Sequence, residues 1–334
     1  MTHDEPPFPR PRCGHEVRDE VHPHAPHMSP LHVGLDEGLS KTNLAVVEAG
    51  GHLLLEARID HFDREQEQQI PDEHVTHRIA QHLAAFRSHP LHLFGSHIRN
   101  SQEFFTRLHA AGLDVRSLDV FNDTHGHYGL TTMPGNAVTV GCGSYWNAMY
   151  YDQENHVHCF AGDIWQEVPW SFSGIAFARF LLAWWQEAED TEMPSALGEE
   201  IVACTGLAPH LLRERIDPAL SLDALSPARW LPLGVLISRY LHEQRVCTFL
   251  SQGVRELQQL YTRFCVQVHP LSPPVLVLGG SIWSTPIFAH AQRQLETWGI
   301  PVAHSQGNPP WGAIRFRHAN PAVQLEPWAS HVSI

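Results

Sequence analysis

Residues His32–Val47 read HVGLDEGLSKTNLAVV, and this stretch decides the fold of the amino-terminal half. A short apolar run ends in the acid Asp36, a turn follows, and a second apolar run begins. Gly50–Gly51 then favours a hairpin into a third run, His52–Glu56. The spacing therefore predicts three consecutive antiparallel strands, with a glycine-bearing turn directly after the first.

Alternating helices and strands follow this meander. Apolar residues at helical spacing over 75–86 predict the first helix. The later predicted elements are a strand at 91–95, a helix at 100–112, strands at 115–121, 137–140, 145–151 and 156–160, helices at 173–188, 194–205, 231–246 and 250–268, a strand at 275–278 and a helix at 285–298. Because the second half again opens with a meander, the sequence predicts an α/β fold with a duplicated architecture.

Three glycine-bearing turns follow predicted strands, at Asp36–Thr42, Gly141–Ser144 and Gly279–Ser281. Glycine after a strand lets a phosphate or a sugar approach the backbone closely. Each turn taken alone is common in proteins and is weak evidence. All three in this order, with Asp123 between the first two, indicate a phosphate-binding site.

These turns resemble the motifs of the actin/hexokinase/heat-shock-chaperone ATPase superfamily. Within it, the sequence is most similar to the BadF/BadG-type ATPase and N-acetylglucosamine kinase family. The matches are, in chain order, Asp36–Thr42 (D-G-G-G-T-x-T, the first phosphate motif), Asn122–Asp123 (the N-D pair), Gly141–Ser144 (G-T-G-S, the second phosphate motif), Leu276–Ser281 (the adenosine motif) and, loosely, Pro309–Ala313 (Pro-x-x-Gly-Ala). The resemblance spans roughly residues 31–320.

The resemblance implies two ribonuclease-H-like (actin-like ATPase) domains that form two lobes around a nucleotide cleft. We expect an amino-terminal lobe over 31–132 and a carboxy-terminal lobe over 133–334, whose last segment packs back on the first lobe. Residues 1–30 are rich in proline and histidine, and proline disfavours regular structure. They are expected to form a flexible tail.

The resemblance also implies the ligands and the reaction: ATP, Mg²⁺ and phosphoryl transfer to a hydroxyl of a sugar or sugar-like molecule. Asp36 is expected to hold Mg²⁺, because a carboxylate beside a phosphate turn can bind the ion through water. The residues expected to bind the phosphates and the adenosine are Gly38, Ser40, Lys41, Thr42, Gly141, Gly143, Ser144, Gly279, Gly280 and Ser281. The residues expected to face the acceptor are Asn122, Asn147 and Asp163.

Asp123 is the candidate catalytic base. It follows a predicted strand, where its carboxylate could accept the proton of the acceptor hydroxyl. The alternative is a helix cap ahead of Thr124. One residue can serve both purposes, and both interpretations stay open.

The sequence departs from the family pattern at several positions. Leu39 replaces a glycine of the first motif, and Cys142 replaces the threonine of the second. The region 162–171 does not match the acceptor loop of the N-acetylglucosamine kinases. The acceptor could therefore be another sugar, an aminoglycoside-like compound or another polyol. Two alternatives remain: a non-catalytic nucleotide or sugar sensor, and a BadF-type ATPase that acts on a partner protein.

Composition limits the choice of partners. The 334 residues include 36 acids and 22 bases, and the formal net charge is −14. Phosphate-backbone binding needs clustered lysine and arginine, so this balance disfavours nucleic acid. The sequence has no apolar run near the roughly 18 residues of a membrane span and opens without an apolar signal segment, so we expect a cytoplasmic protein with no membrane partner. Related sugar kinases often dimerise, which leaves a homodimer open.

Cysteine and histidine give weaker signals. The six cysteines include no CxxC pair, so reduced thiols are the simple interpretation. The 26 histidines are spread along the whole chain. Surface composition is favoured over metal binding for most of them, including those of the tail.

Overall fold

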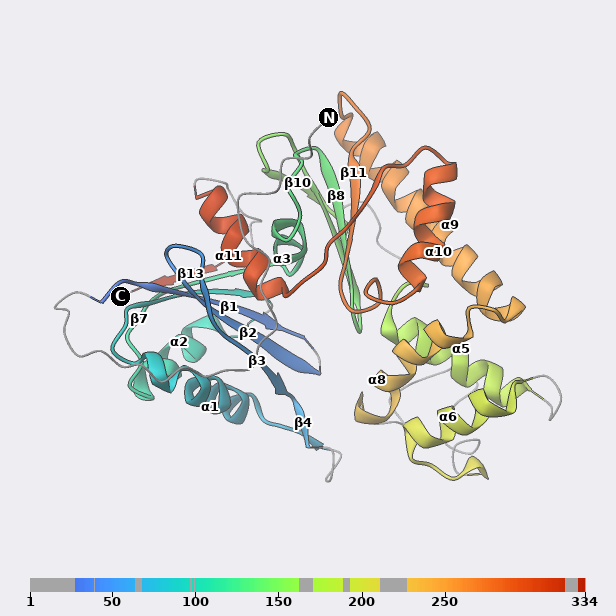
Figure 1. Cartoon of the computed structure of the whole chain (residues 1–334), viewed down its shortest axis with the longest axis horizontal. Helices are drawn as coiled ribbons and strands as arrows, with labels where there is room; N and C mark the ends of the chain where they lie inside the picture. The colour runs from blue at the N-terminus through green and yellow to red at the C-terminus, as the bar shows by residue number, and fades with distance from the viewer. Residues whose placement is uncertain are drawn as a thin grey trace.

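The computed structural model describes residues 28–38, 40–63, 68–96, 98, 100–161, 171–188, 193–210, 227–321 and 330–333. These residues form two α/β lobes, each built on one large sheet (Figure 1). The tail expected over 1–30 lies almost wholly outside the described residues. Within the described ranges, no helix has the length and apolar character that a membrane crossing requires.

In each lobe a run of strands comes first and helices follow. Their bounds are α1 (Asp72–His82), η1 (Leu83–Phe86), α2 (Ser101–Ala110), α3 (Thr124–Gly129), α5 (Gly174–Glu187), α6 (Ser195–Thr205), α8 (Pro227–Leu236), η3 (Ile237–Tyr240), α9 (Gln244–Val268), α10 (Ile287–Thr297) and α11 (Pro309–Ala319), with η1 and η3 being short 3₁₀ helices. The first-lobe sheet is covered by α1 and α2, and the second lobe holds α5 to α10 (Figure 1).

The first lobe holds a six-stranded sheet in the order β13-β7-β6-β1-β2-β3. Its strands are β1 (Leu31–Glu37), β2 (Lys41–Glu48), β3 (Leu53–Asp60), β6 (Leu91–Ser96), β7 (Val115–Phe121) and β13 (Ser330–Ser333), and a separate short ribbon pairs β4 (Phe62–Asp63) with β5 (Gln68–Gln69). The predicted antiparallel meander is confirmed as β1-β2-β3. Strands β1, β6 and β7 run parallel, so Asp36, Ser96 and Phe121 lie side by side at one edge.

Alternating residues of β1 face different helices. Val33 and Leu35 belong to the buried core that includes apolar residues of α1 and α2. Gly34, between them, faces α11, and a Cβ at this position would clash with the backbone of Pro310. Because successive residues of a strand point to opposite faces, α1 and α2 cover one face of the sheet and α11 lies on the other.

The second lobe holds a five-stranded sheet in the order β10-β9-β8-β11-β12. Its strands are β8 (Ala137–Cys142), β9 (Trp146–Tyr151), β10 (Val157–Phe160), β11 (Val275–Gly279) and β12 (Val302–His304). Val138 and Leu276 face a large core shared with α5, α9 and α10. The alternate residues Ala137 and Val277 pack instead against Tyr128 of α3. Helix α3 therefore lies on the opposite face of this sheet.

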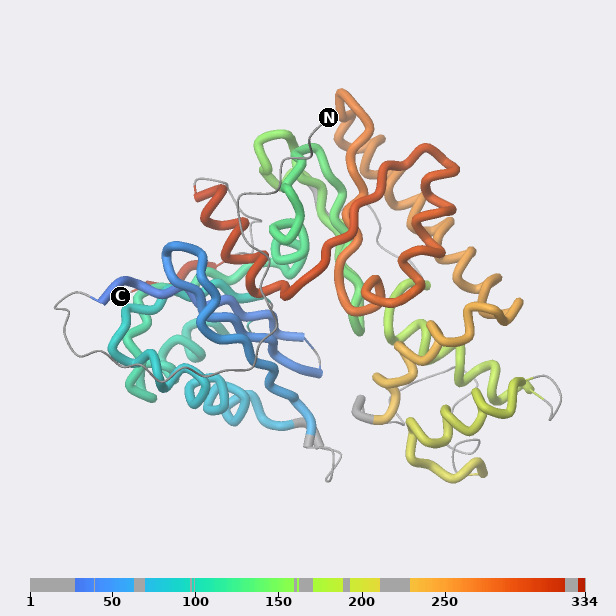
Figure 2. The backbone as a smooth tube through the Cα atoms, in the orientation of Figure 1, coloured from blue at the N-terminus to red at the C-terminus, as the bar shows by residue number. Residues whose placement is uncertain are grey.

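Helices α3 and α11 join the two lobes and cross at glycines. A Cβ at Gly129 would collide with the carbonyl oxygen of Gly312, and a Cβ at Gly312 would collide with that of Gly126. Two helix backbones can approach this closely only where side chains are absent. The chain reaches α11 by crossing from β12 back toward the first sheet (Figure 2), where β13 pairs with β7.

The structure corrects two element predictions. The helices expected at 231–246 and 250–268 have the wrong boundary, since α9 runs unbroken from Gln244. Its buried residues Val246, Leu250, Val254 and Leu257 form one continuous stripe with no glycine or proline at the expected break. Helix α11 was not predicted, because Pro309 and Pro310 indicate a loop when read alone. Proline is nonetheless well tolerated in the first turn of a helix.

Candidate functional site

Asp36 lies where β1 ends, at the edge shared with β6 and β7. Its two carboxylate oxygens are held separately: Ser96 Oγ donates to Oδ1 at 2.8 Å, and Asn43 Nδ2 donates to Oδ2 at 3.2 Å. Ser96 and Asn43 were not singled out from the sequence. The Ser96 contact depends on the parallel pairing of β1 with β6, two segments far apart in the sequence. The sequence indicated only that both residues lie at the ends of predicted strands.

Asp123 follows β7 and begins α3, yet its neighbour makes the side-chain cap. Asn122 Oδ1 accepts the backbone N–H of Thr124 at 2.9 Å, whereas the Asp123 side chain makes no capping hydrogen bond. Asn122 was expected to face the acceptor. Its side chain is instead buried and caps the start of α3. Asp123 Oδ2 lies instead 3.8 Å from the position that a Cβ on Gly141 would take.

The turns of the second lobe lie at the ends of two adjacent parallel strands. Gly279 of β11 pairs with Gly141 of β8. Gly280 has a φ of +103°, and a Cβ there would collide with the carbonyl oxygen of Cys142. A Cβ on Gly143 would meet no atom within 4 Å, so open space lies against this backbone. The geometry brings one crowded glycine pair and one accessible glycine to the same edge.

The turn at Gly143 and Ser144 is fastened to the start of α5. The Gly143 carbonyl accepts the N–H of Gly174 at 2.7 Å, and the Ser144 carbonyl accepts that of Ile175 at 3.2 Å. The Gly143 N–H donates to the Tyr145 carbonyl at 2.8 Å, which closes the turn. The backbone here is therefore fixed before any ligand binds.

The first phosphate motif is only partly directed outward. The Gly38 N–H donates to the Lys41 carbonyl at 2.8 Å and closes the hairpin between β1 and β2. The Thr42 hydroxyl is buried and lies 2.7 Å from His61 Nε2. It is thus engaged inside the lobe, away from the phosphate role expected for it. Ser40 is partly exposed, and Leu39 lies outside the described residues.

Lys41 lies within electrostatic reach of Asp36. Burial and the nearby Arg58 lower the pKa of Lys41 from its ordinary value, while Asp36 and Asp60 act to raise it. Lys41 also pairs with Asp60 across the β2–β3 ladder. Lys41 therefore places an amino group at the first turn, where it also interacts with the carboxylates of Asp36 and Asp60.

Two of the remaining expected residues, Asn147 and Ser281, lie within the described part of the chain. Asn147 of β9 lies opposite Gly141 of β8, and its Oδ1 accepts the N–H of Ala148 at 2.9 Å. Ser281 is exposed just after Gly280. Asp163 lies outside the described residues. The structure thus brings Asp36, Asp123 and the Gly141 turn to one region, which we call the strand-edge site together with Ser96.

His127 belongs to this site and was not predicted. It lies on α3 with 6% of its surface exposed, and its ring packs against the glycine backbones of both strands. A Cβ on Gly279 would be 2.6 Å from its Nδ1, and one on Gly141 would be 2.9 Å from its Cδ2. Only its position four residues after Asp123, on one helix face, could have suggested it.

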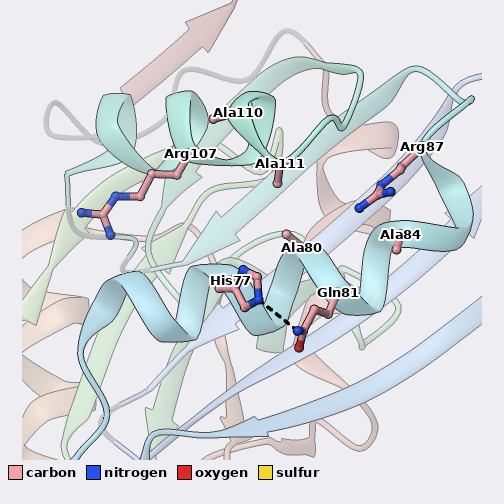
Figure 3. Close-up of a pocket in the computed structure, with 8 residues that line it drawn as sticks. All are labelled: His77, Ala80, Gln81, Ala84, Arg87, Arg107, Ala110 and Ala111. Carbon is pink, nitrogen blue, oxygen red and sulfur yellow. Dashed lines mark hydrogen bonds between the residues drawn. The ribbon is translucent and has the colours of Figure 1, made fainter.

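Two cavities lie on the first lobe. One of about 520 Å³ separates α1 from α2 (Figure 3). Its lining residues are His77, Ala80, Gln81, Ala84, Arg87, Arg107, Ala110 and Ala111, none of which belongs to the strand-edge site. The other, of about 280 Å³, lies at the end of β1, where Glu37 and the first turns of α1 and α2 line it. Glu37 alternates with Asp36 along β1, so this cavity opens on the α1/α2 face of the sheet, and none of its lining residues belongs to the strand-edge site.

The strand-edge site holds two carboxylates, those of Asp36 and Asp123, and Asp36 is the one that the sequence predicts as the magnesium ligand. Among the described residues, the one group of three metal-ligating side chains with ligand atoms within 4.8 Å of one another is Asp152, Glu154 and His156, on the β9–β10 hairpin. Mg²⁺ usually takes one or two carboxylates together with substrate phosphates. Asp36 fits that pattern, because its oxygens are already oriented by Ser96 and Asn43.

Comparison with solved structures gives the fold a name. A candidate N-acetylglucosamine kinase from Porphyromonas gingivalis has 15% sequence identity and a TM-score of 0.62, covering 88% of this chain and 100% of that chain. This chain has the two-lobed actin-like ATPase fold. No protein-family model matches the sequence, and no curated protein matches it.

Two further structures share the actin-like ATPase fold. A candidate N-acetylglucosamine kinase from Chromobacterium violaceum has 13% identity and a TM-score of 0.59, covering 86% of this chain and 99% of that chain. A ROK-family glucokinase from Streptomyces griseus, solved with glucose and AMPPNP, has 14% identity and a TM-score of 0.54, covering 86% and 98%. At these identities the likeness establishes the fold, and activity must be argued from the site.

Proposed function

We propose that this protein transfers the γ-phosphoryl group of ATP to a hydroxyl of a sugar or sugar-like molecule, with Mg²⁺. The observation that carries the proposal is the place of Asp123. Its carboxylate lies beside the Gly141 turn of the second lobe, although the residue itself belongs to the first-lobe strand edge that holds Asp36. A carboxylate at the meeting point of two phosphate turns is suited to an in-line transfer.

Asp123 acts as the general base in this proposal. It accepts the proton of the acceptor hydroxyl as that oxygen attacks the γ-phosphorus, and ATP supplies the phosphoryl group. Because Asn122 caps α3, the Asp123 side chain can turn toward the reacting groups without leaving the helix uncapped. A positioned base of this kind contributes about 10²–10⁴-fold to a rate.

Asp36 and the glycine turns hold Mg-ATP in this proposal. Ser96 and Asn43 orient the Asp36 carboxylate, and such outer contacts tune a metal site. The open space at Gly143 admits phosphate oxygens against the backbone. The adenosine is assigned to Gly279–Gly280 from the resemblance of the motif. Lys41, Ser40 and Ser144 add a cation and hydroxyl donors at the rim. These placements support nucleotide binding at this edge, although the N–H groups of Gly38 and Gly143 are already used within their own turns.

The acceptor is proposed to be hexosamine-like, which the named relatives with this fold support. The motif order supports the same branch, the BadF/BadG-type and N-acetylglucosamine kinase family. Because two of the named structures are candidate N-acetylglucosamine kinases, amino sugars and aminoglycosides belong in the acceptor panel.

The test is ADP release by the full chain with Mg-ATP across hexoses, hexosamines, aminoglycosides and polyols. We expect release that depends on one acceptor class and disappears when EDTA removes Mg²⁺. Release without any acceptor, stimulated only by a second protein, would contradict the proposal and favour the partner-ATPase alternative. Nucleotide binding with no release on the whole panel would favour the sensor alternative.

A further inference from the structure

We propose that His127 is a further residue of the phosphoryl-transfer site, whose Nε2–H donates a hydrogen bond to a phosphate oxygen of the nucleotide at the Gly141 turn. The inference rests on the proposed function and adds a phosphate contact to it. It concerns a side chain that no sequence motif assigned.

The His127 ring lies across the ends of two strands. Its Nδ1 side rests on Gly279, where a Cβ would be 2.6 Å away, and its Nε2 side rests on Gly141, where a Cβ would be 3.3 Å away. Glycine at both paired positions is what admits the ring. The imidazole therefore lies directly beneath the two turns that are proposed to hold the phosphates and the adenosine.

The two ring nitrogens are in different surroundings. Nδ1 is buried and has no hydrogen-bond partner among the described residues, whereas Nε2 is not among the buried atoms that lack one. A buried polar atom without a partner costs about 1–3 kcal/mol. His125, two residues earlier, is also buried, but its Nδ1 lies 3.1 Å from the Tyr151 hydroxyl. His127 thus lacks the structural hydrogen bond that its neighbour has.

These surroundings select one tautomer. In a neutral ring, a proton on Nδ1 would be a buried donor facing Gly279 with no acceptor among the described residues, so we assign the proton to Nε2. Nε2 and Asp123 Oδ2 both lie within 4 Å of the same point, the Cβ position of Gly141. A donor and a base thereby flank the same stretch of backbone. An N–H aimed at an anionic oxygen in a closed site makes a strong hydrogen bond.

A packing role alone would not require an imidazole. An apolar ring of similar size could fill the space over both glycines and leave no nitrogen without a partner. This difference separates the two roles experimentally. His127→Phe keeps a ring over Gly141 and Gly279 but removes the donor, and His127→Gln restores an N–H at similar reach.

The experiment measures binding of AMPPNP with Mg²⁺, and of adenosine, by calorimetry on the full chain and both variants. We expect His127→Phe to weaken AMPPNP binding about tenfold or more, leave adenosine binding unchanged, and be largely rescued in His127→Gln. Equal AMPPNP affinity in wild type and His127→Phe would overturn the inference. So would a parallel loss of adenosine binding, which indicates packing.

A second measurement covers the case in which His127→Phe does not fold. In wild-type protein with ¹⁵N-labelled histidine, AMPPNP should shift the Nε2 signal of His127 and adenosine should not. If the protein binds both ligands and neither shifts the Nε2 signal, this inference is overturned and the proposed function still stands. Wild-type protein that binds no nucleotide at all overturns both.

Discussion

Gly280 is the residue at which the second-lobe turn tolerates least change. Its φ of +103° is one that side chains rarely adopt, and a Cβ would also collide with the Cys142 carbonyl. Gly280→Ala should therefore lower the free energy of unfolding by about 2 kcal/mol or more and weaken ATP binding. Urea denaturation and nucleotide calorimetry check both effects.

Gly112 provides the matched control for this substitution. Its φ is also positive, at +81°, but a Cβ there would meet no atom within 4 Å. Gly112→Ala should cost only the backbone strain, about 1 kcal/mol, and leave nucleotide affinity unchanged. Equal losses in the two variants would contradict the close approach described for Gly280.

Sequence motifs could predict some residues of the site but not others. Asp36, Asp123 and the glycine turns lie at or just after the ends of strands, where local pattern pointed to them as candidates. Ser96 comes beside Asp36 through the pairing of β1 with β6, and the His127 ring lies against glycines of the paired strands β8 and β11, so both placements depend on segments distant in the sequence. Thr42 matched the motif letter for letter, yet its hydroxyl is engaged with His61.

Helices α3 and α11 are the elements on which the relation between the lobes depends. Gly129→Ala would place a Cβ against the Gly312 carbonyl, so we expect the helices to separate. The free energy of unfolding should fall by about 2 kcal/mol or more, because backbone atoms cannot move aside as a side chain can. Thermal and urea unfolding would measure the loss.

Gly198 of α6 is the control for a helical glycine. The nearest atom to a Cβ there is Met193 Sδ at 3.8 Å, an ordinary contact. Gly198→Ala should be neutral or stabilise by up to about 1 kcal/mol, because alanine favours helix more than glycine does. A destabilisation as large as that of Gly129→Ala would count against the glycine crossing.

A histidine cluster ties α11 to the first sheet and predicts acid sensitivity. His32 of β1 has ring centroids 4.1 Å from His318 of α11 and 5.9 Å from His92 of β6. Burial, followed by the nearby His318 and His92, lowers the pKa of His32 to about 4. The folded protein therefore resists a proton that the unfolded chain accepts.

Between the ordinary imidazole pKa of 6.5 and the folded-state pKa of about 4, the unfolded chain binds more protons at His32 than the folded protein does. Stability is complete above pH 6.5 and falls as the pH drops toward 4, by at most about 1.4 kcal/mol per pH unit from this residue. His32→Phe should reduce the difference in urea midpoint between pH 7 and pH 5. The exposed His242→Gln should not change it, and an unaltered difference in His32→Phe would refute the role of the cluster.

The sequence pattern predicted helices and strands well only where neighbouring segments of the chain stabilise them. The β1–β2–β3 meander follows from short turns and alternating burial, and its strands were predicted within a few residues. Helix α11 becomes recognisable only when Gly34 and Gly129 are seen to leave room for it. Strand β13 has four residues and depends on its pairing with β7, a segment some 200 positions earlier.

At the scale of the whole molecule, the site is divided between two lobes. Asp36 and Ser96 belong to the first sheet, the Gly141 and Gly279 turns to the second, and Asp123 reaches from one to the other. Closure of such lobes would exclude water and bring the base to the acceptor. The duplicated plan was predictable from the repeated order of elements, whereas the α3–α11 junction was not.

The role proposed for Asp123, the base of a phosphoryl transfer, can be tested directly. The most direct measurement compares transfer to the best acceptor by wild type and Asp123→Asn, on samples whose AMPPNP affinity has also been measured. Asp114→Asn, which alters a carboxylate paired with Arg116 away from the site, is the control. We predict a loss of about 10²–10⁴-fold in turnover for Asp123→Asn, with AMPPNP affinity and Asp114→Asn near wild type. Turnover retained by Asp123→Asn would contradict the account.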